Sequence, residues 1–338
     1  MNAPQPALQA AVVGLGVGEQ HARALASSDL CRLRWLYDLD PAKAARLARE
    51  LGAGQVARSF EEILADPSLG MISIASYDDA HADQVVAALR VRKHVFVEKP
   101  LCRDAGELGR IEAAWRDGGR PHLASNLVLR GAPLYLWLRD RIRAGQFGRL
   151  YAFDGEYLYG RLSKITEGWR KEVLDYSVVL GGGVHLVDLM LELTAERPSS
   201  AYAVGNGICT QGTAFRYSDY VAATYRFPSG LVGRITANFG CVHRHQHVVR
   251  IFGTEATFVY DDAGPRVHRL RDPGLPPDRP EASPLPAGKA VLLPEFLRRI
   301  VERAPSEPQA RREFALMKAC FAADRSLAAG REVALEWA

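Results

Sequence analysis

The first 125 residues alternate short apolar runs with segments of helical periodicity. Mostly apolar runs at 71–75 and 95–97 have the composition of strands that are buried on both faces of a sheet. Before the first of these runs, Ser59 and Glu62 have the spacing of a capping box, which marks the start of a helix. Strands that alternate with helices predict a parallel, doubly wound sheet, an α/β fold.

After about residue 126 the pattern changes to longer strand-like segments separated by turn residues such as Pro228-Ser229-Gly230. These segments lie at 151–159, 220–227, 231–239, 248–252 and 257–260. Turns between consecutive strands favour antiparallel hairpins. Two amphipathic helices are expected from about Pro294 and from about Pro308. We therefore predict a doubly wound domain over 1–125 and an α+β domain with a large, mainly antiparallel, open-faced sheet over 126–338.

The composition excludes several classes of protein. With 48% hydrophobic and 24% charged residues, the chain is typical of a globular protein. The most apolar stretch, 178–195, contains His185, Asp188 and Glu192, so we expect no membrane helix. The net charge of +4 comes from arginines spread along the chain, which argues against a nucleic-acid partner. Five scattered cysteines and no basic N-terminal leader favour a cytoplasmic protein without disulfides.

A glycine-rich turn at 14–18, Gly-Leu-Gly-Val-Gly, follows the first apolar run. Such glycines let the backbone approach a pyrophosphate, which the free N–H groups of the next helix bind. The usual third glycine would stand at position 19, where this chain has Glu19, so the turn is one residue shorter. Asp38 ends the second strand, where a carboxylate binds a ribose hydroxyl and repels a 2′-phosphate. We therefore predict a cofactor site that favours NAD over NADP. The alternative is a solvated turn.

Two further segments place polar residues where chemistry is expected. Lys99 follows the apolar run 95–97, and ligands of parallel sheets lie beyond the carboxyl ends of the strands. A lysine there can exchange protons near a nicotinamide ring, whereas the alternative is an exposed lysine before a proline. Further on, three glycines precede His185 and Asp188, which share one helix face. The alternative for this pair is a buried histidine beside an aspartate cap.

The order of these motifs resembles one enzyme family over essentially the whole chain. The motifs are the glycine turn ending in His21, Ser76-Tyr77-Asp78-Asp79-Ala80-His81, Glu98-Lys99-Pro100, Trp169-Arg170 and the segment 181–188. Together they resemble the glucose-fructose oxidoreductase/inositol dehydrogenase/rhizopine-catabolism (Gfo/Idh/MocA) family. The resemblance implies a Rossmann domain, an open-sheet second domain, an NAD(P) cofactor, and a sugar, sugar nucleotide or cyclitol as substrate.

The motifs and the resemblance together predict the site residues. Lys99 and His185 are expected to be catalytic. The expected cofactor contacts are Gly14, Gly16, Val17, Gly18, Gln20, His21, Asp38, Ser76, Tyr77, His81, Glu98, Lys99, Asn126, Trp169 and Arg170. The expected substrate contacts are Lys99, Arg130, Tyr159, Arg170, Tyr176, His185 and Asp188. The family's aspartate four residues before the histidine is Gly181 here, and Ser76-Tyr77 replaces a more usual Thr-Pro. Two alternatives follow from the missing carboxylate. In one, Tyr176 or Asp175 takes its place, and in the other, proton transfer depends on Lys99 and His185 alone.

The function that we expect is NAD-dependent hydride transfer to or from a secondary hydroxyl or ketone carbon of such a substrate. One alternative is a redox-neutral enzyme that retains its NAD and catalyses epimerisation or elimination. Another is a non-catalytic, nucleotide-sensing binding protein. The exposed face of the second sheet predicts a homodimer or homotetramer formed through that sheet.

Alternating histidines at 243, 245 and 247 raise the question of a metal site. Imidazole is a good zinc ligand, and alternate residues of a strand share one face. No nearby cysteine, aspartate or glutamate completes a closed site with these histidines. We therefore expect a polar strand or an interface edge here, and no bound metal.

Overall fold

The computed structural model describes residues 8–272 and 274–337, which form two compact units. The first unit takes the chain up to Val128 together with Pro286–Met317. The second unit takes Leu129–Leu285 together with the chain from Lys318 onward. The chain first passes from one unit to the other after Val128, close to the expected boundary at 125. The return of 286–317 to the first unit was not expected. No helix in the described ranges is long and apolar enough to cross a membrane.

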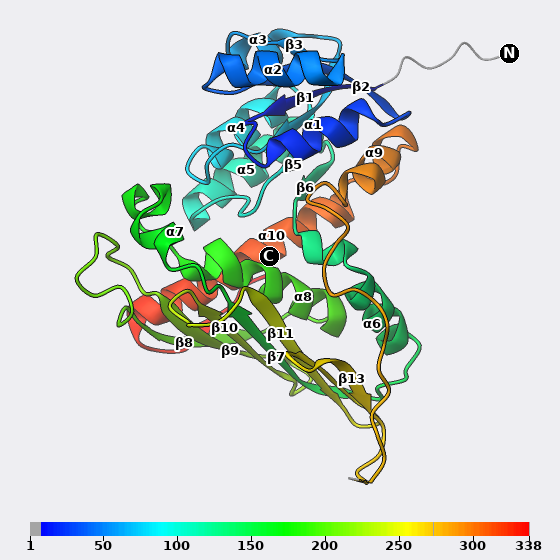
Figure 1. Ribbon diagram of the computed structural model, residues 1–338, viewed down its shortest axis with the longest axis vertical. Helices are drawn as coiled ribbons and strands as arrows, with labels where there is room; N and C mark the ends of the chain where they lie inside the picture. Colours follow the sequence, from blue (N-terminus) through cyan, green and yellow to red (C-terminus); the bar gives the residue numbers. More distant parts are fainter. Residues whose placement is uncertain (1–7, 273, 338) are drawn as a thin grey trace, which may run out of the picture. The chain divides into compact units, whose positions relative to one another are not determined.

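The first unit contains a parallel sheet of six strands in the order β3-β2-β1-β4-β5-β6 (Figure 1). Its strands are β1 (Leu8–Val13), β2 (Cys31–Tyr37), β3 (Gln55–Val56), β4 (Leu69–Ile74), β5 (His94–Val97) and β6 (Leu123–Ser125). The helices between them are α1 (Gly18–Ala26), α2 (Pro41–Leu51), α3 (Phe60–Ala65), α4 (His81–Arg90) and α5 (Ala105–Asp117). The strand order reverses between β1 and β4, which is where doubly wound sheets bind ligands. The predicted α/β fold of this region is confirmed.

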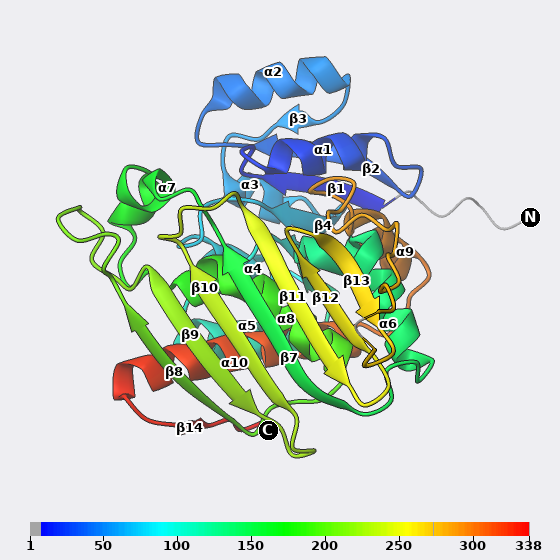
Figure 2. The same cartoon turned by 60° about the horizontal axis from the view of Figure 1, so that its bottom comes forward.

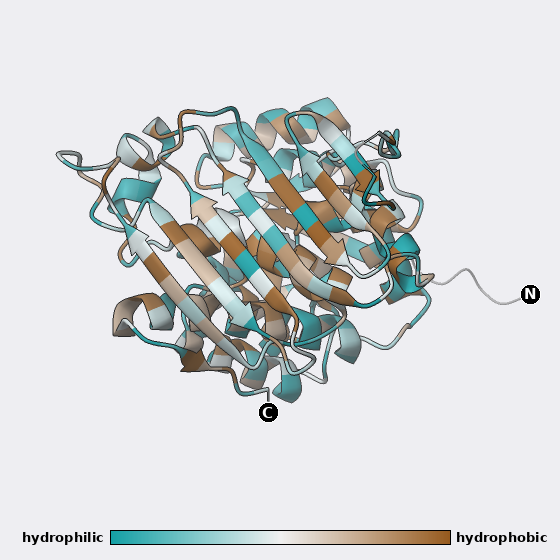
Figure 3. Ribbon diagram, turned by 90° about the horizontal axis from the view of Figure 1, so that it is seen from below, coloured by the Kyte–Doolittle hydropathy of each residue, from teal (hydrophilic) through white to brown (hydrophobic). Residues whose placement is uncertain are grey.

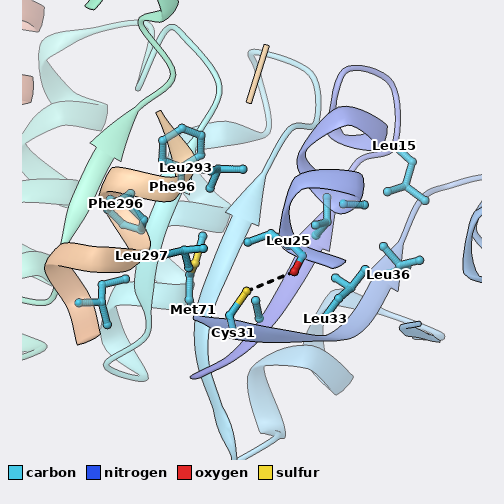
Figure 4. Packing of buried hydrophobic residues seen from close by; sticks show 14 of the residues in the cluster. Leu15, Leu25, Cys31, Leu33, Leu36, Met71, Phe96, Leu293, Phe296 and Leu297 are labelled. Atoms are coloured by element: carbon cyan, nitrogen blue, oxygen red, sulfur yellow. Dashed lines mark hydrogen bonds between the residues drawn. The ribbon is translucent and has the colours of Figure 1, made fainter. Parts of the chain in front are cut away.

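The segment that returns to the first unit carries α9 (Leu293–Val301) and the first part of α10 (Glu307–Ala329). Four apolar residues of α9 are buried in the core of the parallel sheet (Figure 4): Leu293, Phe296, Leu297 and Ile300. The Phe296 ring centroid lies 5.4 Å from that of Phe96 on β5. Burial of each large side chain contributes about 1.5–3 kcal/mol, so this helix adds substantially to the core.

The second unit is built on an eight-stranded sheet in the order β13-β12-β11-β7-β10-β9-β8-β14. Its strands are β7 (Leu150–Leu158), β8 (Ser200–Asn206), β9 (Tyr220–Arg226), β10 (Val232–Asn238), β11 (Gln246–Gly253), β12 (Thr257–Asp261), β13 (Gly264–His268) and β14 (Val333–Ala334). All pairs are antiparallel except β7 with β10. The predicted mainly antiparallel sheet is confirmed.

One face of this sheet is covered by helices (Figure 2). The shorter elements of the unit are η1 (Val128–Gly131), which begins in the first unit, α6 (Pro133–Arg143), α7 (Ser163–Thr166), η2 (Trp169–Glu172), the π-helical turn η3 (Val179–Gly183) and α8 (Val184–Thr194). The later part of α10 packs on β9, where the buried Tyr225 hydroxyl donates a hydrogen bond to the Ala319 carbonyl at 3.3 Å. The turn η3 runs directly into α8 and so fixes where that helix begins over the sheet.

Candidate functional site

The glycine turn after β1 has a different physical requirement at each glycine. Gly14 has φ of +81°, and a Cβ there would meet the Ala75 carbonyl oxygen at 2.5 Å. At Gly18 a Cβ would lie only 3.0 Å from the Ala75 Cβ, so glycine lets α1 approach β4 closely. At Gly16 a Cβ would meet nothing within 4 Å. The turn therefore keeps an open approach at Gly16 to the N-terminus of α1, as a bound pyrophosphate requires.

Asp38 lies at the end of β2 with its carboxylate fixed against this turn. Its Oδ2 accepts a hydrogen bond from the Leu15 N–H at 2.6 Å, and its Oδ1 accepts one from the Asp40 N–H at 3.0 Å. The Lys43 Nζ lies 3.7 Å from Oδ2. A fixed carboxylate beside the glycine turn fits the ribose of a dinucleotide, and the lysine partly offsets its negative charge.

Three of the expected cofactor residues form a buried polar network with one another. His21 is 0% exposed, with its Nδ1 2.9 Å from Ser73 Oγ and its Nε2 3.3 Å from Glu98 Oε1. Asn126 Nδ2 donates to Glu98 Oε1 and to the Lys289 carbonyl, each at 2.6 Å. Burial raises the pKa of Glu98, but the hydrogen bonds from His21 and Asn126 outweigh it and hold the pKa below its usual range. The network fixes the loop that carries the next residue, Lys99.

The same network contains one acceptor that suits a ligand. Asn126 Oδ1 is buried and accepts no hydrogen bond from any described residue. Buried polar atoms without a partner are rare in proteins, so a hydrogen-bond donor from a bound molecule would satisfy it. Together with the open approach at Gly16, this orphaned acceptor shows that the first unit fits a dinucleotide.

Lys99 stands at the carboxyl end of β5, half-buried, and joined to Pro100 by a cis peptide bond. The loop after β4 is tied to this position by His81, which is 0% exposed. The His81 Nδ1 lies 2.7 Å from the Pro100 carbonyl oxygen, and its Nε2 lies 3.2 Å from that of Ser76. His81 thus holds two loops together from inside, whereas Tyr77 on the first loop is 55% exposed.

Two more expected cofactor residues lie around α1. Val17 is the residue before the first turn of α1. The Gln20 side-chain oxygen accepts a hydrogen bond from the Lys289 N–H at 3.1 Å, so Gln20 anchors the returning segment. Sequence reasoning could not anticipate this contact, because the two residues are 269 positions apart.

In the second unit, the three glycines before α8 make room for two tyrosines and the sheet. A Cβ at Gly181 would lie 2.2 Å from the Tyr176 hydroxyl oxygen, and a Cβ at Gly182 would lie 2.2 Å from Cε1 of Tyr157. At Gly183 the nearest atom, the Ala237 Cβ, is at an ordinary 3.4 Å. The Tyr176 hydroxyl therefore occupies the space into which a side chain at 181 would project, one turn before His185.

A cluster of imidazole and phenol rings lies where β7 and β10 end and β11 begins. We call it the histidine–tyrosine face, and its members are Tyr157, Tyr159, His185, His245 and His247. The ring centroid of Tyr157 lies 5.2 Å from those of His245 and His247, 5.8 Å from that of Tyr159 and 6.4 Å from that of His185. The His185 and His247 centroids are 5.8 Å apart. All members except His245 are buried.

Arg130 and Asp188, both expected to contact substrate, are paired with each other. The Arg130 guanidinium donates from Nε to Oδ2 at 2.9 Å and from Nη2 to Oδ1 at 2.6 Å. The Arg130 and Asp188 side chains are only 13% and 2% exposed. A bidentate pair of this kind fixes both side chains, so it orients the first turns of α8 beside His185. Elsewhere in the unit, the Arg170 Cζ lies 4.5 Å from the ring centroid of Trp169 in η2.

The histidines at 243–247 do not form the expected polar strand or edge. Only His247 lies on a strand, and β11 is an interior strand between β7 and β12. His243 instead contacts Asp262, with 3.0 Å between its Nε2 and the carboxylate Oδ2. Among the residues that the structure describes, no group of three His, Cys, Asp or Glu side chains is arranged to hold a metal ion.

Sequence reasoning missed Tyr157 and the contacts of His245 and His247. A signal was present, because Tyr157 with Tyr159 and His245 with His247 each have the two-residue spacing that puts side chains on one face of a strand. What the spacing does not give is the pairing of β7 with β11, which places His247 opposite Tyr157.

Family models match both units. Residues 8–122 match the oxidoreductase family with an NAD-binding Rossmann fold, and residues 135–259 match the GFO/IDH/MocA C-terminal domain. The fold also matches that of a levoglucosan dehydrogenase solved in complex with NADH, with a TM-score of 0.85, 22% identity and coverage of 97% of this chain and 99% of that one.

Among curated proteins, the chain is 31% identical over 199 residues to a 1,5-anhydro-D-fructose reductase of Ensifer adhaerens, 57% of each chain. It is 25% identical over 250 residues to a levoglucosan dehydrogenase of Pseudarthrobacter phenanthrenivorans, 67% of this chain and 64% of that protein. These two matches span less than two thirds of the relatives' own length. A third relative, 24% identical over 255 residues, is a 2,7-anhydro-N-acetylneuraminate hydratase of Escherichia coli. Matched over both of its units, the chain belongs to the Gfo/Idh/MocA family of oxidoreductases with an NAD-binding Rossmann domain.

Proposed function

We propose that this protein transfers a hydride between NAD and a secondary hydroxyl or ketone carbon of a sugar, sugar nucleotide or cyclitol. The observation that carries the proposal is the glycine turn, open at Gly16 and flanked by the fixed carboxylate of Asp38. The curated relatives named as a reductase and a dehydrogenase act on sugar derivatives, as their names state, which supports this substrate class.

NAD, when bound, supplies the acceptor for the hydride. The chain's own contribution is to hold it: the backbone at Gly16 and the free N–H groups of α1 bind the pyrophosphate, and Asp38 accepts hydrogen bonds from ribose hydroxyls. Asp38 also repels a 2′-phosphate. Because Lys43 lies 3.7 Å from the carboxylate, we expect the preference for NAD over NADP to be moderate rather than absolute.

His185 removes or returns the proton of the reacting hydroxyl, and Lys99 shares this role. Proton removal concerted with hydride loss avoids a high-energy alkoxide and contributes about 10²- to 10⁴-fold to the rate. Tyr176 places its hydroxyl in the space beside Gly181, where it can donate a hydrogen bond to a substrate oxygen. Tyr159, Arg170 and the Arg130–Asp188 pair contribute polar surface for the remaining substrate hydroxyls.

The second candidate is a redox-neutral reaction in which the protein keeps its NAD and oxidises and then re-reduces the same substrate. The curated relative named as a hydratase favours it, because addition of water changes no overall oxidation state. The same residues would serve both reactions, since the difference lies in whether NADH accumulates.

We also propose that the protein is a homodimer or homotetramer formed through the outer face of the eight-stranded sheet. Tyr202, Val204 and Val232 are 44–50% exposed. Figure 3 shows hydrophobic and hydrophilic residues interspersed along the strands of this sheet. The charged residues at its centre are paired across strands: Arg234 with Asp154 at 3.0 Å and Arg250 with Glu156 at 2.6 Å. A mixed apolar face with neutralised charges is suited to burial against a second copy. Light scattering that finds a monomer at micromolar concentration contradicts this.

The experiment that tests the reaction is incubation of the protein with NAD and a panel of polyols. The panel contains levoglucosan, 1,5-anhydro-D-glucitol, myo-inositol and scyllo-inositol, and both NADH and the polyol are followed. Accumulation of NADH with loss of a polyol supports the dehydrogenase. Conversion of a polyol at constant NAD supports the redox-neutral enzyme. Tight NAD binding with no hydride exchange, tested also with the matching ketones and NADH, contradicts both.

A further inference from the structure

The backbone of Lys289 is fixed where the carboxyl ends of the strands in the parallel sheet meet α1. Its N–H donates a hydrogen bond to Gln20 Oε1 at 3.1 Å, and its carbonyl accepts one from Asn126 Nδ2 at 2.6 Å. Gln20 lies in the first turn of α1, and Asn126 directly follows β6. Shortly after Lys289, α9 begins at Leu293, which is buried in the core. The segment before α9 therefore holds Lys289 between the start of α1 and the end of β6.

The side chain of Lys289 is free to bind a ligand, in contrast to its backbone. The residue is exposed, and within residues 8–272 and 274–337 no group forms a hydrogen bond or an ion pair with its ammonium. The ammonium is a compact charge on a flexible four-carbon stem. It can therefore reach an anion bound nearby without breaking an existing contact.

The glycine turn beside this segment would benefit from a positive charge. A dinucleotide carries negative charge on both phosphates of its pyrophosphate, whereas the start of a helix supplies the equivalent of only about half a positive charge. The Asp38 carboxylate also flanks this turn, with Lys43 at 3.7 Å to offset it. In the first turn of α1, Glu19 adds a negative charge, which is paired with Arg23 at 2.7 Å. A further cation near the turn would therefore favour the binding of a pyrophosphate.

An independent observation indicates that a ligand fits beside Lys289. Asn126, which binds the Lys289 carbonyl through its amide nitrogen, is 1% exposed, and its Oδ1 accepts no hydrogen bond from any described residue. Buried polar atoms of this kind normally have a partner, which a bound dinucleotide would supply. We propose that the Lys289 ammonium binds the pyrophosphate of the dinucleotide, so that the segment returning to the first unit completes its cofactor site. This role is the same for both candidate reactions.

The test is the affinity of the full chain for NADH and for ADP-ribose, measured by calorimetry in the wild type and in Lys289→Ala. ADP-ribose keeps the pyrophosphate and lacks the nicotinamide ring, so it separates the proposed contact from a contact with the ring. We expect Lys289→Ala to weaken the binding of both ligands about tenfold at low salt, the scale of one hydrogen bond to a charged group. Both backbone hydrogen bonds of residue 289 remain in the variant, so its melting temperature without ligand should match that of the wild type.

Three further variants assign the effect to the charge and to its position. Lys289→Gln keeps most of the stem without the charge and should lose affinity as Lys289→Ala does. Lys289→Arg keeps a cation that binds phosphate oxygens, so it should recover most of the affinity. Arg32→Ala is the matched control, because it removes an exposed positive charge at the start of β2, the opposite edge of the same sheet. It should bind both ligands as the wild type does.

The dependence on salt tests whether the interaction is electrostatic. Salt screens the attraction between charges, so the tenfold difference between the wild type and Lys289→Ala should shrink as the ionic strength rises from about 0.01 M to about 1 M. A difference that stays constant over this range contradicts an ion pair with the pyrophosphate.

The proposal is also overturned if Lys289→Ala and Lys289→Gln bind both ligands as tightly as the wild type. It fails equally if only NADH binding weakens, since the contact would then be with the nicotinamide, or if Arg32→Ala weakens binding as much. A wild-type protein that binds neither NADH nor ADP-ribose would instead contradict the proposed function.

Discussion

The two units each contain a run of glycines before a helix, and the runs exist for different reasons. In the first unit, Gly14 has a positive φ and Gly16 leaves space that nothing in the described chain fills. In the second, the space beside Gly181 and Gly182 is already filled by Tyr176 and Tyr157. One turn is therefore open to a ligand, whereas the space beside the other is occupied by two tyrosine side chains. Similar sequence patterns thus serve different purposes, an open backbone turn in the first unit and the packing of aromatic side chains in the second.

The largest expected effect concerns Lys99 and His185, the two residues that we propose transfer protons. Lys99→Ala and His185→Ala should each lower kcat by about 10²- to 10⁴-fold, because each removes acid–base assistance. NAD affinity should change little in His185→Ala, since its role is with the substrate. Steady-state kinetics beside melting temperatures check this. A folded His185→Ala protein with full activity would remove His185 from the mechanism.

Asp324, whose side chain is partly buried, is hydrogen-bonded to the segment that leads into the second glycine turn, so its protonation should affect stability. Ser177 Oγ donates to Asp324 Oδ1 at 2.8 Å and accepts the Leu180 N–H at 3.2 Å. Burial raises the pKa of Asp324 to about 7, against the opposing hydrogen bond from Ser177. Because the folded pKa lies above the unfolded one, the folded state is favoured at low pH. Stability should therefore fall as the pH rises from about 4 to about 7.

Asp324→Asn removes this titration while keeping an acceptor for Ser177. The variant should gain on the order of a few kcal/mol over the wild type by about pH 8, with little difference near pH 4. Denaturant unfolding at both pH values measures it, and equal pH dependence in the two proteins would contradict the assignment.

The glycines of the second turn can be compared directly with one another. Gly182→Ala forces a methyl group into the Tyr157 ring and should destabilise the protein by about 1–3 kcal/mol. Gly183→Ala adds a methyl at an ordinary contact distance from Ala237 and is the control, with little loss expected. Thermal unfolding of both variants decides it. If the two variants have the same melting temperature, contact with the Tyr157 ring does not explain why position 182 is a glycine.

The smallest expected effect concerns the choice of cofactor in the first unit. Asp38→Ser removes the repulsion of a 2′-phosphate and leaves Lys43 in place, so NADPH affinity should rise about tenfold while NADH affinity falls. Calorimetry with both cofactors measures the change. Wild-type protein that already binds NADPH as tightly as NADH would refute the role given to Asp38.

The sequence allows much of the first unit to be predicted and less of the second. The turn at Gly14 and the position of Asp38 are local, so their spacing is enough to locate them. The return of α9 to the parallel sheet depends on contacts such as Phe96 with Phe296, which periodicity does not reveal. Likewise, the histidine–tyrosine face requires the pairing of β7 with β11, and strand register over so long a separation cannot be read from alternation alone.

The proposed cofactor site depends most directly on Gly16, because the open space there is what admits a bound pyrophosphate. The decisive measurement is the dissociation constant for NAD of Gly16→Ala beside that of the wild type, with the melting temperature of each. A methyl group there meets no protein atom within 4 Å, so stability should be unchanged. NAD affinity should fall about tenfold or more, because the methyl group would block the approach of the pyrophosphate. A Gly16→Ala protein that binds NAD as tightly as the wild type would contradict the account.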